Sequence, residues 1–163
     1  MANFFHPLAF ISEKSSIDIS SKGTHTYIGE GSVIDDFVRI KHTGGSEDIR
    51  IGNFVYLNSC TVLYSGNGIQ IGNNVLIGPN CSLTPVNHNT NDKNIPIRLQ
   101  GFLPSKGGII IEDDVWIGAN VTILDGAIIR KGAVIGANSL VNKEVESYSI
   151  NFGTPLKFIS YRK

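Results

Sequence analysis

The clearest pattern along the chain is a six-residue period that runs from Ile111 to Val141. Each block of six opens with a β-branched aliphatic residue, and these residues are Ile111, Ile117, Ile123, Ile129, Ile135 and Val141. The fifth place is small or β-branched, and it holds Val115, Val121, Ala127, Ala133 and Ser139. A period of six is neither the 3.6 of a helix nor the alternation of a long strand. We therefore predict a short strand and a turn, repeated, with the first and fifth places facing inward.

The fourth place of each block carries a residue that tolerates left-handed backbone. These residues are Asp114, Asn120, Gly126, Gly132 and Asn138. Because Gly, Asn and Asp adopt positive φ at little cost, this place is predicted to form the corner after each strand. The same spacing occurs upstream, in the sets Ile11 and Ile17; Ile28, Ile34 and Ile40; Ile51, Leu57 and Leu63; and Ile71, Ile77 and Leu83.

This repeat resembles that of the hexapeptide-repeat acyltransferases. The resemblance is closest to their sugar and xenobiotic O-acetyltransferases, such as the maltose and galactoside acetyltransferases. It implies an all-β, left-handed parallel β-helix in which three blocks make one triangular coil. The hand comes from the resemblance, because it opposes the usual right-handed crossover. We expect a single domain over residues 1–163, with a cap and opening coil over 1–27, coils over 28–146, an extended loop over 87–108 and a C-terminal tail over 147–163.

The steps between successive sets show where residues are inserted. Four steps exceed six residues, and they are eleven from Ile17 to Ile28, eleven from Ile40 to Ile51, eight from Leu63 to Ile71 and twenty-eight from Leu83 to Ile111. Each insertion follows a third block if Ile17 is third in its own coil. We therefore predict that all four insertions leave the same edge of the prism, which in repeat proteins is usually the working side.

Composition and charge narrow the function classes. Lys+Arg and Asp+Glu both number 14, so the net charge is zero and nothing indicates binding to nucleic acid or to a membrane surface. The first ten residues lack the basic start and apolar stretch of a signal peptide. No apolar run approaches the ~20 residues of a membrane span. We expect a cytoplasmic protein with reduced thiols at Cys60 and Cys81, which both fall inside repeat blocks.

The longest insertion, over residues 87–108, is mostly polar and contains Pro96 and Pro104. Structureless loops of this length are uncommon in compact domains and tend to be functional. A disordered surface insertion is the alternative. Apolar residues argue against full disorder, because they give the loop side chains to bury, for instance against a neighbouring subunit. These residues are Ile97, Leu99, Phe102 and Leu103.

His88 is the residue that we expect to act as the catalytic base, and an ordinary surface histidine is the alternative. It lies in the series IGPNCSLTPVNHNT at the base of the long loop. This series resembles the stretch that carries the catalytic histidine in O-acetyltransferases of the family. Imidazole titrates near neutral pH, so it can take the hydroxyl proton as the acceptor attacks a thioester. We expect direct transfer in a ternary complex, with the ring oriented by a loop carbonyl or by Asp92.

The resemblance also implies residues that contact the acceptor. Asn58 matches a family asparagine near the reacting hydroxyl, with an ordinary corner asparagine as the alternative. Trp116 is expected to form a wall of the same cleft, with an outward aromatic at a subunit contact as the alternative. This chain has Ser65 and Gly66 where the thiogalactoside and maltose enzymes carry acidic residues that hold sugar hydroxyls. That departure puts those particular acceptors in doubt.

Acetyl-CoA is the co-substrate that the resemblance implies. In the family it lies in a groove between neighbouring prisms, where small corner residues allow close approach to the backbone. Ala119 and Ala137 match these small residues. Asn142-Lys143 matches a Thr-Lys pair of the family, and Lys157 matches a basic residue toward the nucleotide phosphates. For each lysine the alternative is a solvated surface charge. The second basic residue of the family falls on Ser160, so Arg162 or Lys163 is left to replace it.

The leading interpretation is an acetyl-CoA-dependent O-acetyltransferase acting on a sugar or similar small hydroxylated acceptor. The family implies a homotrimer, because each of its sites is built from two adjacent subunits. The enzyme alternative is an N-acetyltransferase of a nucleotide-linked amino sugar, and a non-catalytic scaffold is the alternative from a different class. A zinc enzyme like the γ-class carbonic anhydrases would need three converging histidines. No His-x₄-His spacing occurs, so no metal is expected.

Overall fold

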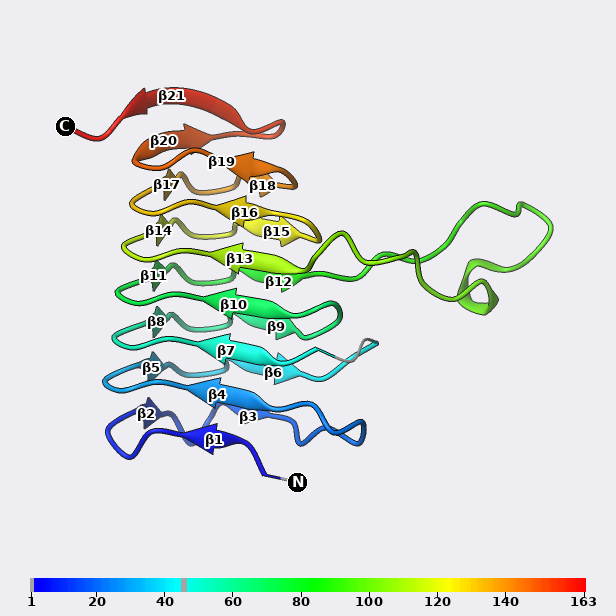
Figure 1. The fold of residues 1–163 in the computed structure, drawn as a ribbon, viewed down its shortest axis with the longest axis horizontal. Helices are drawn as coiled ribbons and strands as arrows, with labels where there is room; N and C mark the ends of the chain where they lie inside the picture. The colour runs from blue at the N-terminus through cyan, green and yellow to red at the C-terminus, as the bar shows by residue number, and fades with distance from the viewer. Residues whose placement is uncertain (1, 45–46) are drawn as a thin grey trace.

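The computed structural model describes residues 2–44 and 47–163, and these fold into a three-sided prism with one projecting arm (Figure 1). The described residues form 21 short strands and one 3₁₀ helix, η1 (Ile97–Leu99). Successive strands turn from one side of the prism to the next, so that every third strand returns to the same side. This confirms the predicted all-β solenoid of parallel strands.

The three sides of the prism are the sheets A, B and C. Sheet A contains β1 (Phe4–Phe5), β4 (Thr26–Ile28), β7 (Ile49–Ile51), β10 (Ile69–Ile71), β13 (Ile109–Ile111), β16 (Ile128–Ile129) and β19 (Glu144–Val145). Sheet B contains β2 (Phe10–Ile11), β5 (Val33–Ile34), β8 (Tyr56–Leu57), β11 (Leu76–Ile77), β14 (Trp116–Ile117), β17 (Val134–Ile135), β20 (Ser149–Phe152) and the antiparallel β21 (Lys157–Tyr161). Sheet C contains β3 (Ser16–Ile17), β6 (Arg39–Lys41), β9 (Val62–Tyr64), β12 (Ser82–Thr84), β15 (Thr122–Leu124) and β18 (Leu140–Val141).

The first places of the blocks stack on one another in register from coil to coil. In sheet C, for example, Leu63 pairs with Leu83, Leu83 with Ile123, and Ile123 with Val141. All four side chains are fully buried, as are their counterparts in the other two sheets. The fifth places from Val115 to Ser139 are buried as well. The core is therefore a column of aliphatic side chains along the prism axis, as the six-residue period predicts.

The fourth places adopt positive φ, as predicted, and they do so even where the residue is unfavourable for it. Asp114, Asn120 and Asn138 have φ values of 60°, 56° and 58°. Phe54, which also stands in a fourth place, has a φ of 55°. Its ring covers the preceding coil, where an added Cβ on Gly31 would lie 2.6 Å from it. The coil thus imposes left-handed backbone at its corners, although this conformation costs an aromatic residue about 1–2 kcal/mol.

All four insertions leave the prism between sheets C and A, as predicted from the spacing of the sets. They connect β3 to β4, β6 to β7, β9 to β10 and β12 to β13. This edge is called the C–A edge below, and the edge between sheets B and C is called the B–C edge. Insertion at the C–A edge leaves the register of the coils unchanged, because each chain segment re-enters sheet A in step with its neighbours.

The coils continue beyond residue 146, where the sequence pattern fades. Val145 pairs in register with Ile129, and Asn151 pairs with Ile135. Asn151 stands in the first place of its block and is buried, with its Nδ2 donating to Ser149 Oγ over 2.7 Å. Because this inward place holds a polar residue, the six-residue pattern of the sequence did not predict the last block. No helix among the described residues is long and apolar enough to cross a membrane.

Truncating one side chain of the aliphatic column should destabilise the protein strongly. We expect Leu83→Ala to lower the free energy of unfolding by about 2–5 kcal/mol, because it removes buried methyl groups and leaves a cavity. Ser82→Ala, which changes the neighbouring outward side chain, should cost about 0.5 kcal/mol or less. Urea unfolding at one fixed protein concentration measures both. Equal losses for the two variants would contradict the inward stacking of Leu83.

Candidate active site

The longest insertion forms an arm that projects from the C–A edge (Figure 1). It occupies residues 85–108, between β12 and β13. The two sides of the arm pair at its base, where Leu103 N donates to Asn87 O over 2.8 Å. Toward the tip, Gln100 Nε2 donates to Asp92 O over 2.7 Å. The arm is thus a hydrogen-bonded hairpin, which contradicts the alternative of a fully disordered insertion.

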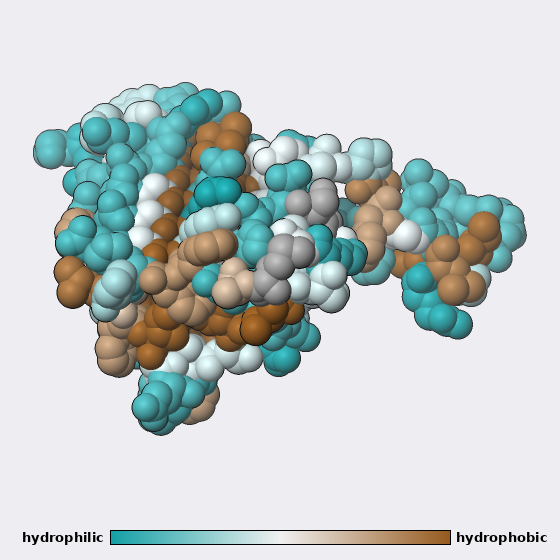
Figure 2. Space-filling model, turned by 60° about the horizontal axis from the view of Figure 1, so that its bottom comes forward, coloured by the Kyte–Doolittle hydropathy of each residue, from teal (hydrophilic) through white to brown (hydrophobic). Residues whose placement is uncertain are grey.

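Apolar side chains of the arm are exposed in the single chain. Their exposed fractions range from 37 to 60%, and the residues are Ile95, Ile97, Leu99, Phe102 and Leu103. Figure 2 shows apolar surface near the end of the arm as well as on the prism. These side chains do not bury themselves against the prism of their own chain. They therefore offer the arm a surface for packing against another molecule.

His88 lies on the outgoing side of the arm and pairs across the hairpin with Phe102. The two ring centroids are 4.8 Å apart, with the rings tilted by 37°. The His88 side chain is exposed, and among the described residues no hydrogen bond reaches either ring nitrogen. Asp92, one of the two candidates for orienting the ring, instead accepts from Asn94 N over 2.8 Å. Among the residues that the structure describes, neither Asp92 nor a loop carbonyl orients the ring.

The other three histidines have ring nitrogens committed to the protein. His42 contacts Thr24 Oγ1 through Nδ1 at 2.9 Å and Thr26 Oγ1 through Nε2 at 3.0 Å. Burial lowers the pKa of His42, which favours the neutral ring. His25 Nδ1 contacts a backbone carbonyl at 3.0 Å, and His6 Nδ1 accepts from a backbone N–H at 3.2 Å. Among the described residues, His88 is the histidine with neither ring nitrogen in a hydrogen bond.

A buried carboxylate fastens the base of the arm. Asp125 lies at the C–A edge after β15 and is 4% exposed. Its Oδ2 accepts from Lys106 N at 2.9 Å and from Asn67 Nδ2 at 3.1 Å, and its Oδ1 accepts from Gly108 N at 2.9 Å. Hydrogen bonds to a charged acceptor are the stronger kind. Asp125 therefore ties the returning side of the arm to the corner of another coil, a contact that the sequence pattern did not reveal.

The structure explains why acidic residues are absent at positions 65 and 66. Ser65 is buried, and its Oγ accepts from Thr43 N over 3.1 Å. An added Cβ on Gly66 would lie 2.0 Å from the Val86 side chain, and Gly66 has a φ of 40°. An acidic side chain at Gly66 would therefore collide with the start of the arm.

The residues expected at the site divide between two edges of the prism. His88, Asn142 and Lys143 lie at the C–A edge. Asn58, Ala119 and Ala137 lie at the B–C edge, and Trp116 points outward from the adjoining sheet B, where it is 53% exposed. Lys157 opens β21, which pairs antiparallel with β20 at the end of sheet B. Since sheet C separates the two edges, the structure does not bring these residues together within one chain.

Asn58 has the structural role of a corner asparagine. Its Nδ2 donates to Ile77 O over 2.8 Å, so it links two coils as a corner asparagine does. Its position at the B–C edge nevertheless keeps the residue half-buried and within reach of a ligand that lies along that edge. The structural role is therefore present, and contact with an acceptor stays a prediction.

Sheet B carries an outward apolar ladder that the sequence analysis overlooked apart from Trp116. Its paired residues are Phe10, Val33, Tyr56, Leu76, Trp116, Val134 and Ile150. The available signal was the sixth place of each block, which faces solvent and yet is large and apolar here. Tyr56, Leu76 and Trp116 are 37, 45 and 53% exposed. This ladder is a surface suited to contact with another subunit.

Cysteine chemistry finds no support in the site. Cys81 is buried, and its Sγ donates to Gly118 O over 3.1 Å. Burial raises the pKa of the Cys81 thiol, which keeps it protonated and unreactive. Cys60 is an exposed corner residue. Both thiols are free, as expected. Among the described residues, no three His, Cys, Asp or Glu side chains are grouped to hold a metal ion.

Two family models match the chain. A model of the bacterial transferase hexapeptide, six repeats long, matches residues 108–143, and a model of the hexapeptide repeat of succinyl-transferase matches residues 57–87. The galactoside O-acetyltransferase of Escherichia coli is 30% identical over 157 residues, which are 96% of this chain and 72% of that protein. A probable acetyltransferase of Mycobacterium tuberculosis is 30% identical over 96% of this chain and 51% of its own length. The chain thus spans about half the length of that relative.

Solved structures share the fold. A mutant of AntD, an N-acyltransferase from Bacillus cereus in complex with dTDP-4-amino-4,6-dideoxyglucose and coenzyme A, aligns with a TM-score of 0.79 at 25% identity, covering 95% of this chain and 81% of that one. A hexapeptide-repeat acetyltransferase from Vibrio cholerae, complexed with acetyl coenzyme A, aligns with a TM-score of 0.62 at 25% identity. The alignment covers 99% of this chain and 72% of that one.

Removing the carboxylate at the base of the arm should loosen the arm selectively. We expect Asp125→Ala to raise hydrogen exchange at the amides of Lys106 and Gly108 by about tenfold or more, because both lose a charged acceptor. Asp113→Ala is the matched control, since Asp113 Oδ1 accepts from Asn73 N over 2.6 Å at the edge between sheets A and B. The control should leave the arm protected. Unchanged exchange in Asp125→Ala would show that these contacts do not hold the arm.

Proposed function

The chain belongs to the hexapeptide-repeat transferases, whose fold is a left-handed parallel β-helix, and we propose that it moves the acetyl group of acetyl-CoA to a hydroxyl of a sugar or similar small acceptor. The single observation that supports this most is the ring of His88. It stands at the base of the arm, exposed, and its nitrogens are not engaged by the described residues. A general base needs such an uncommitted nitrogen within reach of the substrate.

The proposed chemistry is a direct transfer within a ternary complex. His88 takes the proton of the acceptor hydroxyl as its oxygen attacks the thioester carbon. The tetrahedral intermediate then collapses, the carbon–sulfur bond breaks, and the proton passes to the departing thiolate of coenzyme A. The thioester is activated before it binds, so no covalent acyl-enzyme is needed. Phe102, packed against the His88 ring, restricts the orientations from which the ring can act.

We propose that each site is completed by two copies of the chain. The C–A edge with His88 and Lys143 would face the B–C edge of the next copy, which carries Asn58, Ala119 and Ala137. An interface between two different edges is heterologous, and such contacts close into rings when the rotation allows it. The triangular section of the prism suits a ring of three. The exposed apolar residues of the arm and the outward ladder of sheet B support such packing.

The groove between two copies would hold acetyl-CoA along the prism axis. Ala119 and Ala137 follow equivalent strands of sheet B, so they are repeated one coil apart along the B–C edge. Small side chains there leave the backbone open to the pantetheine arm. Lys143, Lys157 and Asn142 are exposed at the C-terminal end of the prism, where we place the nucleotide phosphates. We place the reaction in the cytoplasm, where acetyl-CoA is available.

N-acylation of an amino sugar is the second candidate. The likeness to AntD favours it, because that protein is an N-acyltransferase found with an amino sugar linked to dTDP. The E. coli relative favours O-acetylation, at 30% identity over nearly the whole chain. Modification of a polysaccharide or of a smaller sugar fits either reaction. The two candidates differ in the acceptor atom and share acetyl-CoA, the groove and the base.

Replacing His88 should remove turnover and leave the coenzyme bound. We expect His88→Ala to lower turnover by about 10²–10⁴-fold, because the general base is lost. The assay follows release of the coenzyme A thiol with a panel of sugars. As a control, acetyl-CoA at about 100 times its dissociation constant should stabilise wild type and variant alike by about 2.7 kcal/mol in thermal melting. Unchanged turnover would mean that another residue is the general base. If acetyl-CoA does not shift the melting temperature, a non-catalytic scaffold would be favoured.

Mixing two inactive variants should restore activity if each site needs two copies. His88→Ala disables the C–A edge, and Ala137→Trp should block the groove at the B–C edge. In mixed rings, a site is intact where the C–A edge of the Ala137→Trp chain meets the B–C edge of the His88→Ala chain. Random mixing at equal amounts gives about one quarter of wild-type sites, and the mixed trimers that carry both tags have one intact site in three. The variants are co-expressed with different tags, purified through both and assayed. No recovery would place the whole site within one chain.

A further inference from the structure

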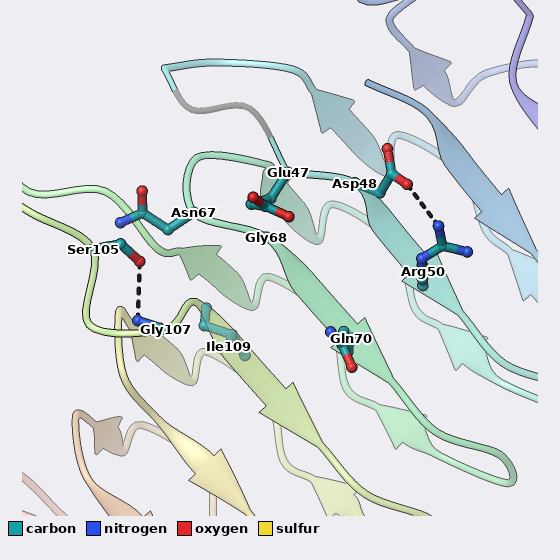
Figure 3. Close-up of a pocket in the computed structure, with 9 residues that line it drawn as sticks. All are labelled: Glu47, Asp48, Arg50, Asn67, Gly68, Gln70, Ser105, Gly107 and Ile109. Atoms are coloured by element: carbon teal, nitrogen blue, oxygen red, sulfur yellow. Dashed lines mark hydrogen bonds and ion pairs between the residues drawn. The ribbon is translucent and has the colours of Figure 1, made fainter. Parts of the chain in front are cut away.

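A polar cleft on sheet A lies directly beside the base of the arm (Figure 3). It has a volume of about 310 Å³. Three segments of the C–A edge form its walls, namely the corner before β7, the corner before β10 and the returning side of the arm. Their contributing residues are Glu47, Asp48, Asn67, Gly68, Ser105 and Gly107. Arg50, Gln70 and Ile109 extend the lining along the strands of sheet A.

The lining of the cleft mixes hydrogen-bond donors and acceptors and carries a net negative charge. Asp48 Oδ2 accepts from Arg50 Nη2 over 2.7 Å, so these two charges compensate each other. Arg50 also lies 4.1 Å from the centroid of the Tyr27 ring, which holds its guanidinium in place. Glu47 adds a second carboxylate, and Gln70 adds an amide that can both donate and accept. This lining suits hydroxyl groups and repels phosphate.

Hydrogen bonds hold two of the three walls of the cleft. Asn67 and Lys106, from different walls, both donate to the buried Asp125 carboxylate, over 3.1 and 2.9 Å. Gly107 N donates to Ser105 Oγ over 2.9 Å, which fixes the turn at the end of the arm (Figure 3). A site whose side chains are held in place loses little conformational entropy on binding. The corner before β10 and the returning side of the arm are therefore held in place by the fold.

The cleft lies close to the proposed base along the arm. His88 pairs with Phe102, and Ser105 follows Phe102 by three residues. At ~3.3 Å per extended residue, and with about 5 Å across the hairpin, the backbone of Ser105 is at most about 15 Å from that of His88. An oligosaccharide that reacts at His88 would therefore have another of its rings within reach of the cleft.

We propose that the polar cleft binds a neutral sugar unit adjacent to the one that is acetylated. The proposal rests on the proposed function. Ser65 and Gly66 cannot provide acidic contacts to a sugar. The cleft would provide contacts of its own, from a different part of the same edge. The acceptor class is then an uncharged oligosaccharide or glycoside. A sugar linked to a nucleotide would bring phosphates against Glu47, so the cleft disfavours it.

The test measures sugar binding directly, on an array of immobilised neutral mono-, di- and trisaccharides. We expect the wild-type protein to retain at least one oligosaccharide more strongly than its component monosaccharides. Gln70→Leu keeps the side-chain volume and removes the amide, and it should weaken this retention by about tenfold, as should Glu47→Gln. Glu30→Gln is the matched control, because Glu30 is an exposed carboxylate at the edge between sheets A and B. It should bind like the wild type.

Three results would overturn the proposal. One is the absence of any retained oligosaccharide, and another is equal retention by the wild type and both cleft variants. The third is displacement of the retained sugar by dTDP, which would mean that the cleft accepts phosphate. Thermal melting with acetyl-CoA separates these outcomes from failure of the proposed function. If acetyl-CoA stabilises the wild type and the variants and any of the three results is found, only the proposal for the cleft fails. The proposed acetyltransferase function would stand.

Discussion

The stacking of equivalent aliphatic side chains from coil to coil is the interaction on which the rest of the structure depends. Leu83 packs between Leu63 and Ile123, and the same arrangement repeats on all three sides of the prism. Each coil is too short to bury its own apolar face, so it gains a core only from its neighbours. Every coil must therefore keep the same perimeter, and this constraint sets the backbone conformation at each corner.

The corners show how far that constraint reaches. Phe54 and Tyr148 occupy left-handed backbone that a bulky residue adopts only at a cost. Both rings lie over a glycine of another coil, Gly31 and Gly132, at distances that exclude a Cβ on the glycine. The unfavourable conformation is thus offset by contact between coils. A residue can be poor for its local geometry and still be retained, provided that its neighbours in the stack accommodate it.

Most of the fold could be predicted from the sequence, because the six-residue period encodes it directly. The position of a residue within its block gives its burial, and the count of blocks gives its edge, as the four insertions show. The assignment of Asn58 and His88 to different edges could have been predicted in the same way. Asn58 follows the second strand of its coil, and His88 comes after the third. The Asp125 contacts and the polar cleft could not, because they depend on how unrelated corner loops converge in space. The last coil was hidden by Asn151, a polar residue in an inward place.

The two edges differ in a way that suits a shared site. The C–A edge accepts four insertions of three different lengths without any change in register, so it can vary its loops and side chains at little cost to the core. The B–C edge has no insertion among the coils and repeats small residues such as Ala119 and Ala137. In the proposed ring, a variable edge that faces a constant edge allows the acceptor side to change while the coenzyme groove stays the same. This separation allows the prism to carry the polar cleft beside one edge and to keep the proposed coenzyme groove at the other.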